Sequence, residues 1–194
     1  NSRGYSRSLL RALTRKGSVQ LDGRPAFLKD RAGPGSELTV ELNDLDYGTV
    51  QPEKIPLEVI FEDEDILVVN KPPGMLVHPL TGEASGTLAN AVVYRWAARG
   101  LNARFRPVYR LDRNTSGLLM VAANPFSYQG LVRQLSGRIL CREYLAVATG
   151  RISPGHGVLS FPIGRSEGSI IKREVKLGGK VAVTHYRVLE QLTG

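Results

Sequence analysis

The chain has 194 residues, of which 42% are hydrophobic, so it is long enough for one substantial core or for a small module beside a larger one. Lysine and arginine outnumber aspartate and glutamate by 26 to 18, and the resulting net charge of +8 favours polyanionic partners. The single cysteine excludes an internal disulfide framework. Since there is no apolar run of about 18 residues and no signal-peptide pattern at the start, we expect a cytoplasmic protein without a membrane span.

The first predicted element is a basic helix over "SRSLLRALTRKG" (6–17), which places three leucines on one face and ends at Gly17. A separate stripe of arginines recurs at every fourth position. Like charges at this spacing repel one another by a few tenths of a kcal/mol, roughly, yet the stripe suits a phosphate backbone. A solvated basic face is the alternative. The stripe consists of Arg3, Arg7, Arg11 and Arg15.

Two strand signals follow this helix. Asp22-Gly23 predicts a tight hairpin turn, and "SELTVEL" (36–42) has the pattern of a further strand. With the helix before them, these elements resemble an S4 RNA-binding module, and the resemblance implies that the basic helix binds structured RNA. We therefore interpret residues 1–43 as an S4-like RNA-binding domain. The polar, proline-containing stretch 44–56 is interpreted as a linker.

Helical and strand-like patterns mix over residues 57–194 without the regular alternation of a βαβ fold. The helical segments have apolar residues at helical spacing, and the strand segments are continuously apolar or alternate. Hairpin-like spacings dominate the second half. The pattern predicts an α+β fold with a mixed, largely antiparallel sheet. The predicted strands cover 66–69, 117–122, 142–150, 169–177 and 181–189, and the predicted helices cover 87–100 and 125–137.

The sequence indicates no metal and no cofactor. His78, His156 and His185 have no cysteine or carboxylate at ligand spacing, which argues against zinc. "DRNTSG" (112–117) imitates the first half of a calcium loop, but its twelfth position is Ala123, where a bidentate glutamate is needed. There is also no phosphate-binding glycine loop and no dinucleotide fingerprint.

One carboxylate remains as a candidate for chemistry. "YRLDRNTSGLLMVA" (109–122) places Asp112 between Arg110 and Arg113, directly before a small Thr-Ser-Gly sequence. Neighbouring positive charge favours the ionised carboxylate. Glycoside hydrolysis by two carboxylates needs a second acid, and no other acidic residue stands in a similar context. From the local composition alone, a reactive carboxylate and a turn residue bonded to arginine explain the pattern equally well.

Four segments resemble the RluA-type pseudouridine synthases. "YRLDRNTSGLLMVA" is similar to the catalytic motif of that family, whose usual form is His-Arg-Leu-Asp-x-x-Thr-Ser-Gly-Leu. "ILVVNKPPGMLVHP" (66–79) is similar to the family's opening strand and turn, and "CREYLAVATG" (141–150) to its Lys-x-Tyr-Leu-Ala-x-Val-x-Gly segment. "SFPIGR" and "KREVKLGGKVAVTHYRV" resemble the strands that follow. The segments occur in the family's order over residues 57–190.

This resemblance implies a role for each of three residues. Asp112 corresponds to the essential aspartate, which attacks or assists bond breakage at the ribose of the target uridine. Arg110 corresponds to the arginine that holds the place of the flipped-out nucleotide, and Tyr144 to the tyrosine that packs against the base. The implied partner is RNA, most specifically large-subunit ribosomal RNA, and no cofactor is implied. We expect a monomer.

The sequence departs from the family's pattern at three points. Tyr109 stands where histidine is usual, and Arg142 stands where lysine is usual. The family's Thr-Gly-Arg-x-His-Gln-Ile-Arg-Val-His segment, which carries the arginine that pairs with the catalytic aspartate, does not occur in the chain. We therefore expect residues 57–194 to be an incomplete catalytic domain. A non-catalytic RNA-binding protein with the synthase fold is the alternative, and an unrelated hydrolase has only Asp112 in its favour.

Overall fold

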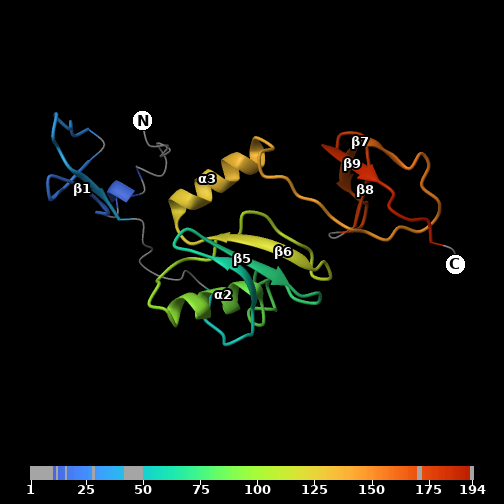
Figure 1. The fold of residues 1–194 in the computed structure, drawn as a ribbon, viewed down its shortest axis with the longest axis horizontal. Coiled ribbons are helices and arrows are strands. Elements are labelled where there is room, and N and C mark those ends of the chain that lie inside the picture. Colours follow the sequence, from blue (N-terminus) through green and yellow to red (C-terminus); the bar gives the residue numbers. More distant parts are fainter. Residues whose placement is uncertain are drawn as a thin grey trace. The chain divides into compact units, whose positions relative to one another are not determined.

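The computed structural model divides by its internal contacts into two compact units, Asn1–Arg142 and Glu143–Gly194 (Figure 1). Most of the chain is described in it, namely residues 11, 13–15, 17–27, 29–41, 50–169 and 172–192. Within these ranges, no helix is both long and apolar enough to cross a lipid bilayer.

A small antiparallel sheet follows the first helix and has the strand order β2-β1-β3. It is formed by β1 (Val19–Leu21), β2 (Arg24–Pro25) and β3 (Leu38–Val40). Between β1 and β2, Asp22 has a φ of 52° and Gly23 a φ of 75°. Two successive positive φ angles give the turn that matches the twist of a two-residue hairpin. The predicted hairpin and the strand after it are therefore confirmed.

The first helix contributes to a small core beneath this sheet. Leu13 is buried together with Val19 and Ala26. Arg11 and Arg15, by contrast, are exposed. This agrees with the predicted separation of an apolar face from a basic one. The other residues of the two faces lie outside the described part of the chain: Arg3, Arg7, Leu9 and Leu10.

A second antiparallel sheet has the order β4-β5-β6. Its strands are β4 (Glu58–Glu62), β5 (Ile66–Lys71) and β6 (Gly117–Ala122). Along β5, every second side chain is fully or almost fully covered, because one face of the strand packs on the core. Every residue of β5 pairs with one of β6, from Ile66 opposite Ala122 to Lys71 opposite Gly117. The strands predicted over 66–69 and 117–122 are thus confirmed, and their pairing is antiparallel.

Helix α2 (Leu88–Ala97) packs on the core face of this sheet. Its first turn is closed by a capping box, in which the side chains of Thr87 and Asn90 each bond to the other's backbone N–H. The fully buried Asn90 also donates from Nδ2 to the carbonyl oxygen of Gln51, 2.8 Å away. Trp96 fills the core beside the strands. The predicted helix is confirmed and ends slightly earlier than Gly100.

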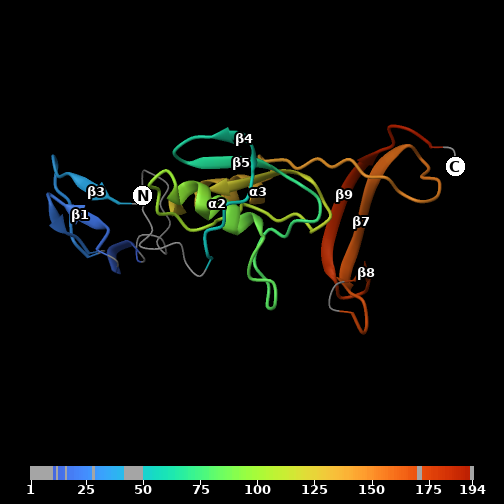
Figure 2. The ribbon, with the colours of Figure 1, turned by 90° about the horizontal axis from the view of Figure 1, so that it is seen from below.

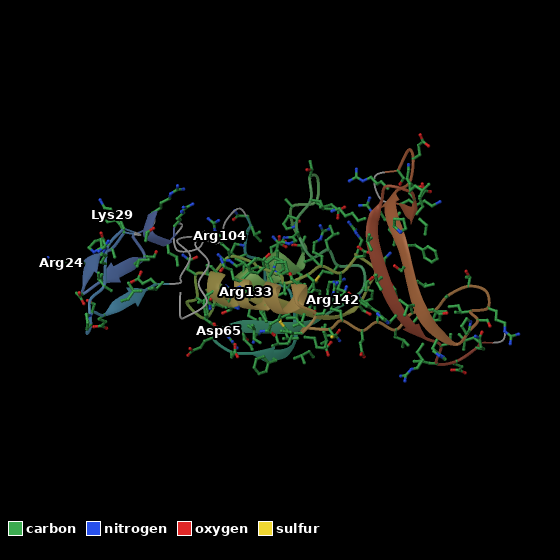
Figure 3. The ribbon with its side chains drawn as sticks, turned by 90° about the horizontal axis from the view of Figure 1, so that it is seen from above. Arg24, Lys29, Asp65, Arg104, Arg133 and Arg142 are labelled. Atoms are coloured by element: carbon green, nitrogen blue, oxygen red, sulfur yellow. The ribbon has the colours of Figure 1, made fainter. Side chains whose placement is uncertain are left out.

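Helix α3 (Pro125–Ser136) lies beside β6 (Figure 1). The Asn124 side chain caps it by accepting bonds from the backbone of Phe126 and Ser127. Asp65, labelled in Figure 3, accepts hydrogen bonds from the side chains of Ser127 and Asn124, and these bonds lower its pKa below the ordinary value of 3.8. Proline suits the first helical position, since no intrahelical partner for its missing N–H exists there. The predicted helix is confirmed.

The second unit contains a third antiparallel sheet, of order β8-β7-β9. Its strands are β7 (His156–Arg165), β8 (Arg173–Val175) and β9 (Lys180–Arg187). The long strands β7 and β9 run side by side (Figure 2). Many large apolar side chains on the three strands of this sheet remain exposed. They include Val158, Leu159, Phe161, Ile163, Val175, Val181 and Val183.

One predicted strand is wrong. Residues 142–150 contain no β-strand, and their side chains are exposed, Leu145 and Val147 at 86% each. A β-strand requires backbone hydrogen bonds to a neighbouring strand. In the part of the chain that the structure describes, no strand pairs with this segment. The alternation of apolar residues was therefore not sufficient to form a strand here.

Candidate active site

Asp112 is exposed in a tight turn just before β6. The turn is closed by the Thr115 N–H, which donates to the Asp112 carbonyl oxygen at 3.1 Å. Leu111 anchors the loop, because its side chain is 7% exposed and belongs to the core. After the turn, Gly117 has a φ of 121°, a backbone conformation that residues with a side chain rarely adopt. The loop therefore presents the carboxylate to solvent from a backbone fixed at both ends.

Lys71 ties this loop to the turn that follows β5. Its side chain is fully buried, and Nζ donates to the carbonyl oxygens of Pro72 at 2.8 Å, Met75 at 2.9 Å and Arg113 at 3.0 Å. The Gly74 N–H donates to the same Arg113 oxygen at 2.9 Å. One ammonium group thus satisfies carbonyls from two segments that are far apart in the sequence.

The candidate carboxylate also acts on the charge of Lys71. Burial lowers the pKa of Lys71 below 10.5, and the negative charge of Asp112 acts in the opposite direction. Sequence reasoning missed this residue, since Lys71 entered it only as one position of the strand-and-turn segment 66–79. A lysine at the end of a buried apolar strand was the available signal.

The two arginines that flank Asp112 in sequence are used differently. Arg113 forms an ion pair with Glu83, with Nη2 2.5 Å from Oε2. Arg110 is exposed, and its charge acts on His78. The pKa of His78 is lowered, first by burial and second by Arg110. His78 also meets the ring of Phe105 edge-on, with centroids 5.0 Å apart.

Tyr109 and Arg142, the two residues that differ from those usual in the family, contact each other. The guanidinium carbon of Arg142 lies 5.4 Å from the centroid of the Tyr109 ring, within the range of a cation–π interaction. The Tyr109 hydroxyl donates to the carbonyl oxygen of Leu118 in β6 at 3.2 Å. Figure 3 labels Arg142 on the segment that follows α3. The pair joins the start of the Asp112 loop to the chain just before Tyr144.

The structure brings together only some of the predicted site residues. Arg110 and Asp112 lie on one loop of the first unit. Tyr144 is 60% exposed and belongs to the second unit, so its packing against a base beside Asp112 stays a prediction. The ranges that the structure describes contain no group of three or more histidine, cysteine, aspartate or glutamate side chains able to hold a metal ion.

Comparison with known proteins identifies a family. The profile of the family described as RNA pseudouridylate synthase matches residues 65–193. The chain is 38% identical over 190 residues to the uncharacterized RNA pseudouridine synthase YlyB of Bacillus subtilis, covering 96% of this chain and 63% of that protein. It is 39% identical over 187 residues to ribosomal large subunit pseudouridine synthase D of Pseudomonas aeruginosa, covering 96% and 58% respectively.

A solved structure shows the same fold. The human protein RNA pseudouridylate synthase domain containing 4 superposes with a TM-score of 0.52 at 22% identity, over 70% of this chain and 54% of that one. The chain spans about 60% of the length of the two bacterial relatives that it matches.

Proposed function

The chain belongs to the RNA pseudouridylate synthase family, and from this membership we propose that the whole protein converts uridine to pseudouridine in RNA. The observation that carries the proposal is the Asp112 turn. It presents one carboxylate to solvent and is tied by the buried Lys71 to the turn after β5. Family membership and a fixed, accessible carboxylate support the same chemistry.

In the proposed reaction, Asp112 acts on the ribose of a uridine that has left the RNA stack. The bond between C1′ and N1 breaks, the uracil turns over, and C1′ joins C5, whose hydrogen leaves as a proton to solvent while N1 takes up a proton. A base inside a helix must be extruded before its glycosidic bond can be reached. The reaction is an isomerisation and consumes no second substrate, so the chemistry requires no cofactor.

Two further side chains have proposed roles in holding the nucleotide. Arg110, exposed on the same loop as Asp112, takes the place of the extruded base, because a guanidinium plane can replace lost stacking. Tyr144 packs its ring on the uracil, since an aromatic face suits a planar base. The exposure of Tyr144 is compatible with a role in binding and argues against a role in core packing.

The proposed substrate is large-subunit ribosomal RNA. Its support is the similarity to a protein named ribosomal large subunit pseudouridine synthase D and the net charge of +8. We further propose that residues 1–43 form an S4-like RNA-binding module, that 44–56 link it to the rest, and that 57–194 are part of the catalytic domain. The exposed Arg11 and Arg15 support RNA binding by the first helix.

The test replaces Asp112 by Asn in the whole protein, which keeps the size of the side chain and removes its charge. Release of tritium from large-subunit ribosomal RNA labelled at uridine C5 should be lost, while RNA binding is retained. Glu64→Gln is the matched control, because Glu64 is an exposed carboxylate outside the loop. Tritium release by Asp112→Asn at a rate close to that of the control would overturn the assignment.

A further inference from the structure

A groove of about 620 Å³ lies beside the Asp112 loop. The extended segment 105–110, which pairs with β6, lines it together with His78 and with Tyr128 from α3. Arg110 lines the groove, whereas Asp112 does not. The groove is therefore adjacent to the candidate carboxylate and distinct from it.

Aromatic side chains form much of the groove. Phe105, Tyr109, Tyr128 and His78 all line it. Two of these rings are held in place: Tyr109 by the Arg142 guanidinium over its face and its bond to the Leu118 carbonyl, and His78 by its edge contact with Phe105. Rings with fixed orientation suit the stacking of a planar ligand, because little rotamer entropy is lost on binding.

The charge of the groove is positive. Arg106 and Arg110 line it, and none of the described residues that line it is acidic. Arg106 is oriented by a hydrogen bond from Nη1 to the Arg104 carbonyl oxygen at 3.1 Å. Fixed aromatic faces next to guanidinium groups suit single-stranded nucleic acid, because its bases stack on the rings and its phosphates bind to the cations.

We propose that this groove binds an unpaired nucleotide of the RNA substrate, next to the uridine that reaches Asp112. The base stacks in the groove against Tyr109, and its phosphate is held between Arg106 and Arg110. Arg110 then separates the two nucleotides, so that occupation of the groove positions the target. This inference rests on the proposed function and adds a second nucleotide subsite to it.

Three histidines make the site observable by nuclear magnetic resonance, because one of them lines the groove and the others lie in the second unit. The protein used is the Asp112→Asn variant, so that no turnover occurs. A short single-stranded oligouridylate and uridine 5′-monophosphate are titrated separately, and inorganic phosphate serves as the third probe. Both nucleotides should shift the ring protons of His78, as expected for a base stacked nearby, and leave those of His156 and His185 in place.

The probes separate base stacking from simple attraction of an anion. If inorganic phosphate reproduces the shift of His78, the groove is an anion site and the proposal is overturned. It is also overturned if neither nucleotide shifts His78. Tritium release by the wild-type protein is measured independently, so failure of the subsite and failure of the proposed function are distinguishable.

Two substitutions test the wall of the groove. Tyr109→Ala should weaken oligouridylate binding by about tenfold or more, the loss expected for one stacked base. Tyr109→Phe keeps the ring and should bind nearly as well as the parent. Tyr94→Ala is the control, because Tyr94 is a partly exposed tyrosine of α2 that lines a different groove. Equal binding by Tyr109→Ala and Tyr109→Phe would refute stacking on this ring.

A third variant keeps the proposal testable if Tyr109→Ala fails to fold. Arg106→Gln leaves the aromatic wall intact and removes one positive charge. It should weaken oligouridylate binding and make that binding less sensitive to salt, since one phosphate contact is lost. Unchanged affinity and unchanged salt dependence would exclude Arg106 from the site.

Discussion

Replacing Lys71 by Met tests the connection between the two turns of the site. Methionine is close to lysine in length and can fill the same buried space. It cannot donate to the carbonyl oxygens of Pro72, Met75 and Arg113, which now receive bonds from Nζ. The substitution therefore leaves three carbonyls without this donor while changing the packed volume little.

The size of the effect follows from these bonds. A hydrogen bond to a charged group contributes about 1.5–3 kcal/mol to stability, and the Lys71 ammonium group donates three such bonds from Nζ. Dehydrating the ammonium group offsets part of this gain, because burying a charge costs several kcal/mol. We expect Lys71→Met to lower the free energy of unfolding by about 2–4 kcal/mol.

The measurement is urea unfolding of the wild type, Lys71→Met and Lys54→Met, followed by tritium release under conditions in which all three are folded. Lys54 is exposed and lies away from the loop, so its substitution should change the unfolding midpoint little. Lys71→Met should also lose most activity, because the Asp112 turn is no longer fixed through Arg113. If both lysine variants unfold at the wild-type midpoint, the proposed role of the buried ammonium is wrong.

Two further predictions concern charge. Because the folded protein holds the pKa of His78 below 6.5, the unfolded chain binds more protons just below that pH, so stability should fall as the pH drops through 6.5. His78→Gln should flatten that part of the stability curve measured by urea unfolding at several pH values. Changing Arg11 and Arg15 together to Gln should make the slope of log affinity against log salt shallower by up to about 2 in filter binding to ribosomal RNA; an unchanged slope would indicate a solvated face.

Local signals in the sequence predicted most of the elements that surround the site. Gly117 and Pro125 mark the starts of β6 and α3, and both residues have conformational properties that act within one or two positions. Asp22-Gly23 specified a hairpin for the same reason. Such features depend on the backbone of neighbouring residues, which is why they are readable without a structure.

Features that depend on distant residues were not predicted. Lys71 bonds to the Arg113 carbonyl oxygen, 42 positions away in the sequence. The contact between Tyr109 and Arg142 likewise joins segments that sequence spacing does not relate. Over 142–150, the alternation of Tyr144 and its neighbours resembled a strand, but a strand also requires a partner, and sequence pattern alone does not supply one.

The pairing of β5 with β6 has a consequence for the order of folding. Their residues Lys71 and Gly117 face each other, so the intervening chain must close as one long loop before the sheet can form. Helix α2 lies within that loop, and local helical contacts form faster than distant strand pairs. The Asp112 turn is the last part of the loop before β6, so it takes its final shape only when the sheet closes. During synthesis, a chain in which β6 is not yet available for pairing therefore has no assembled site.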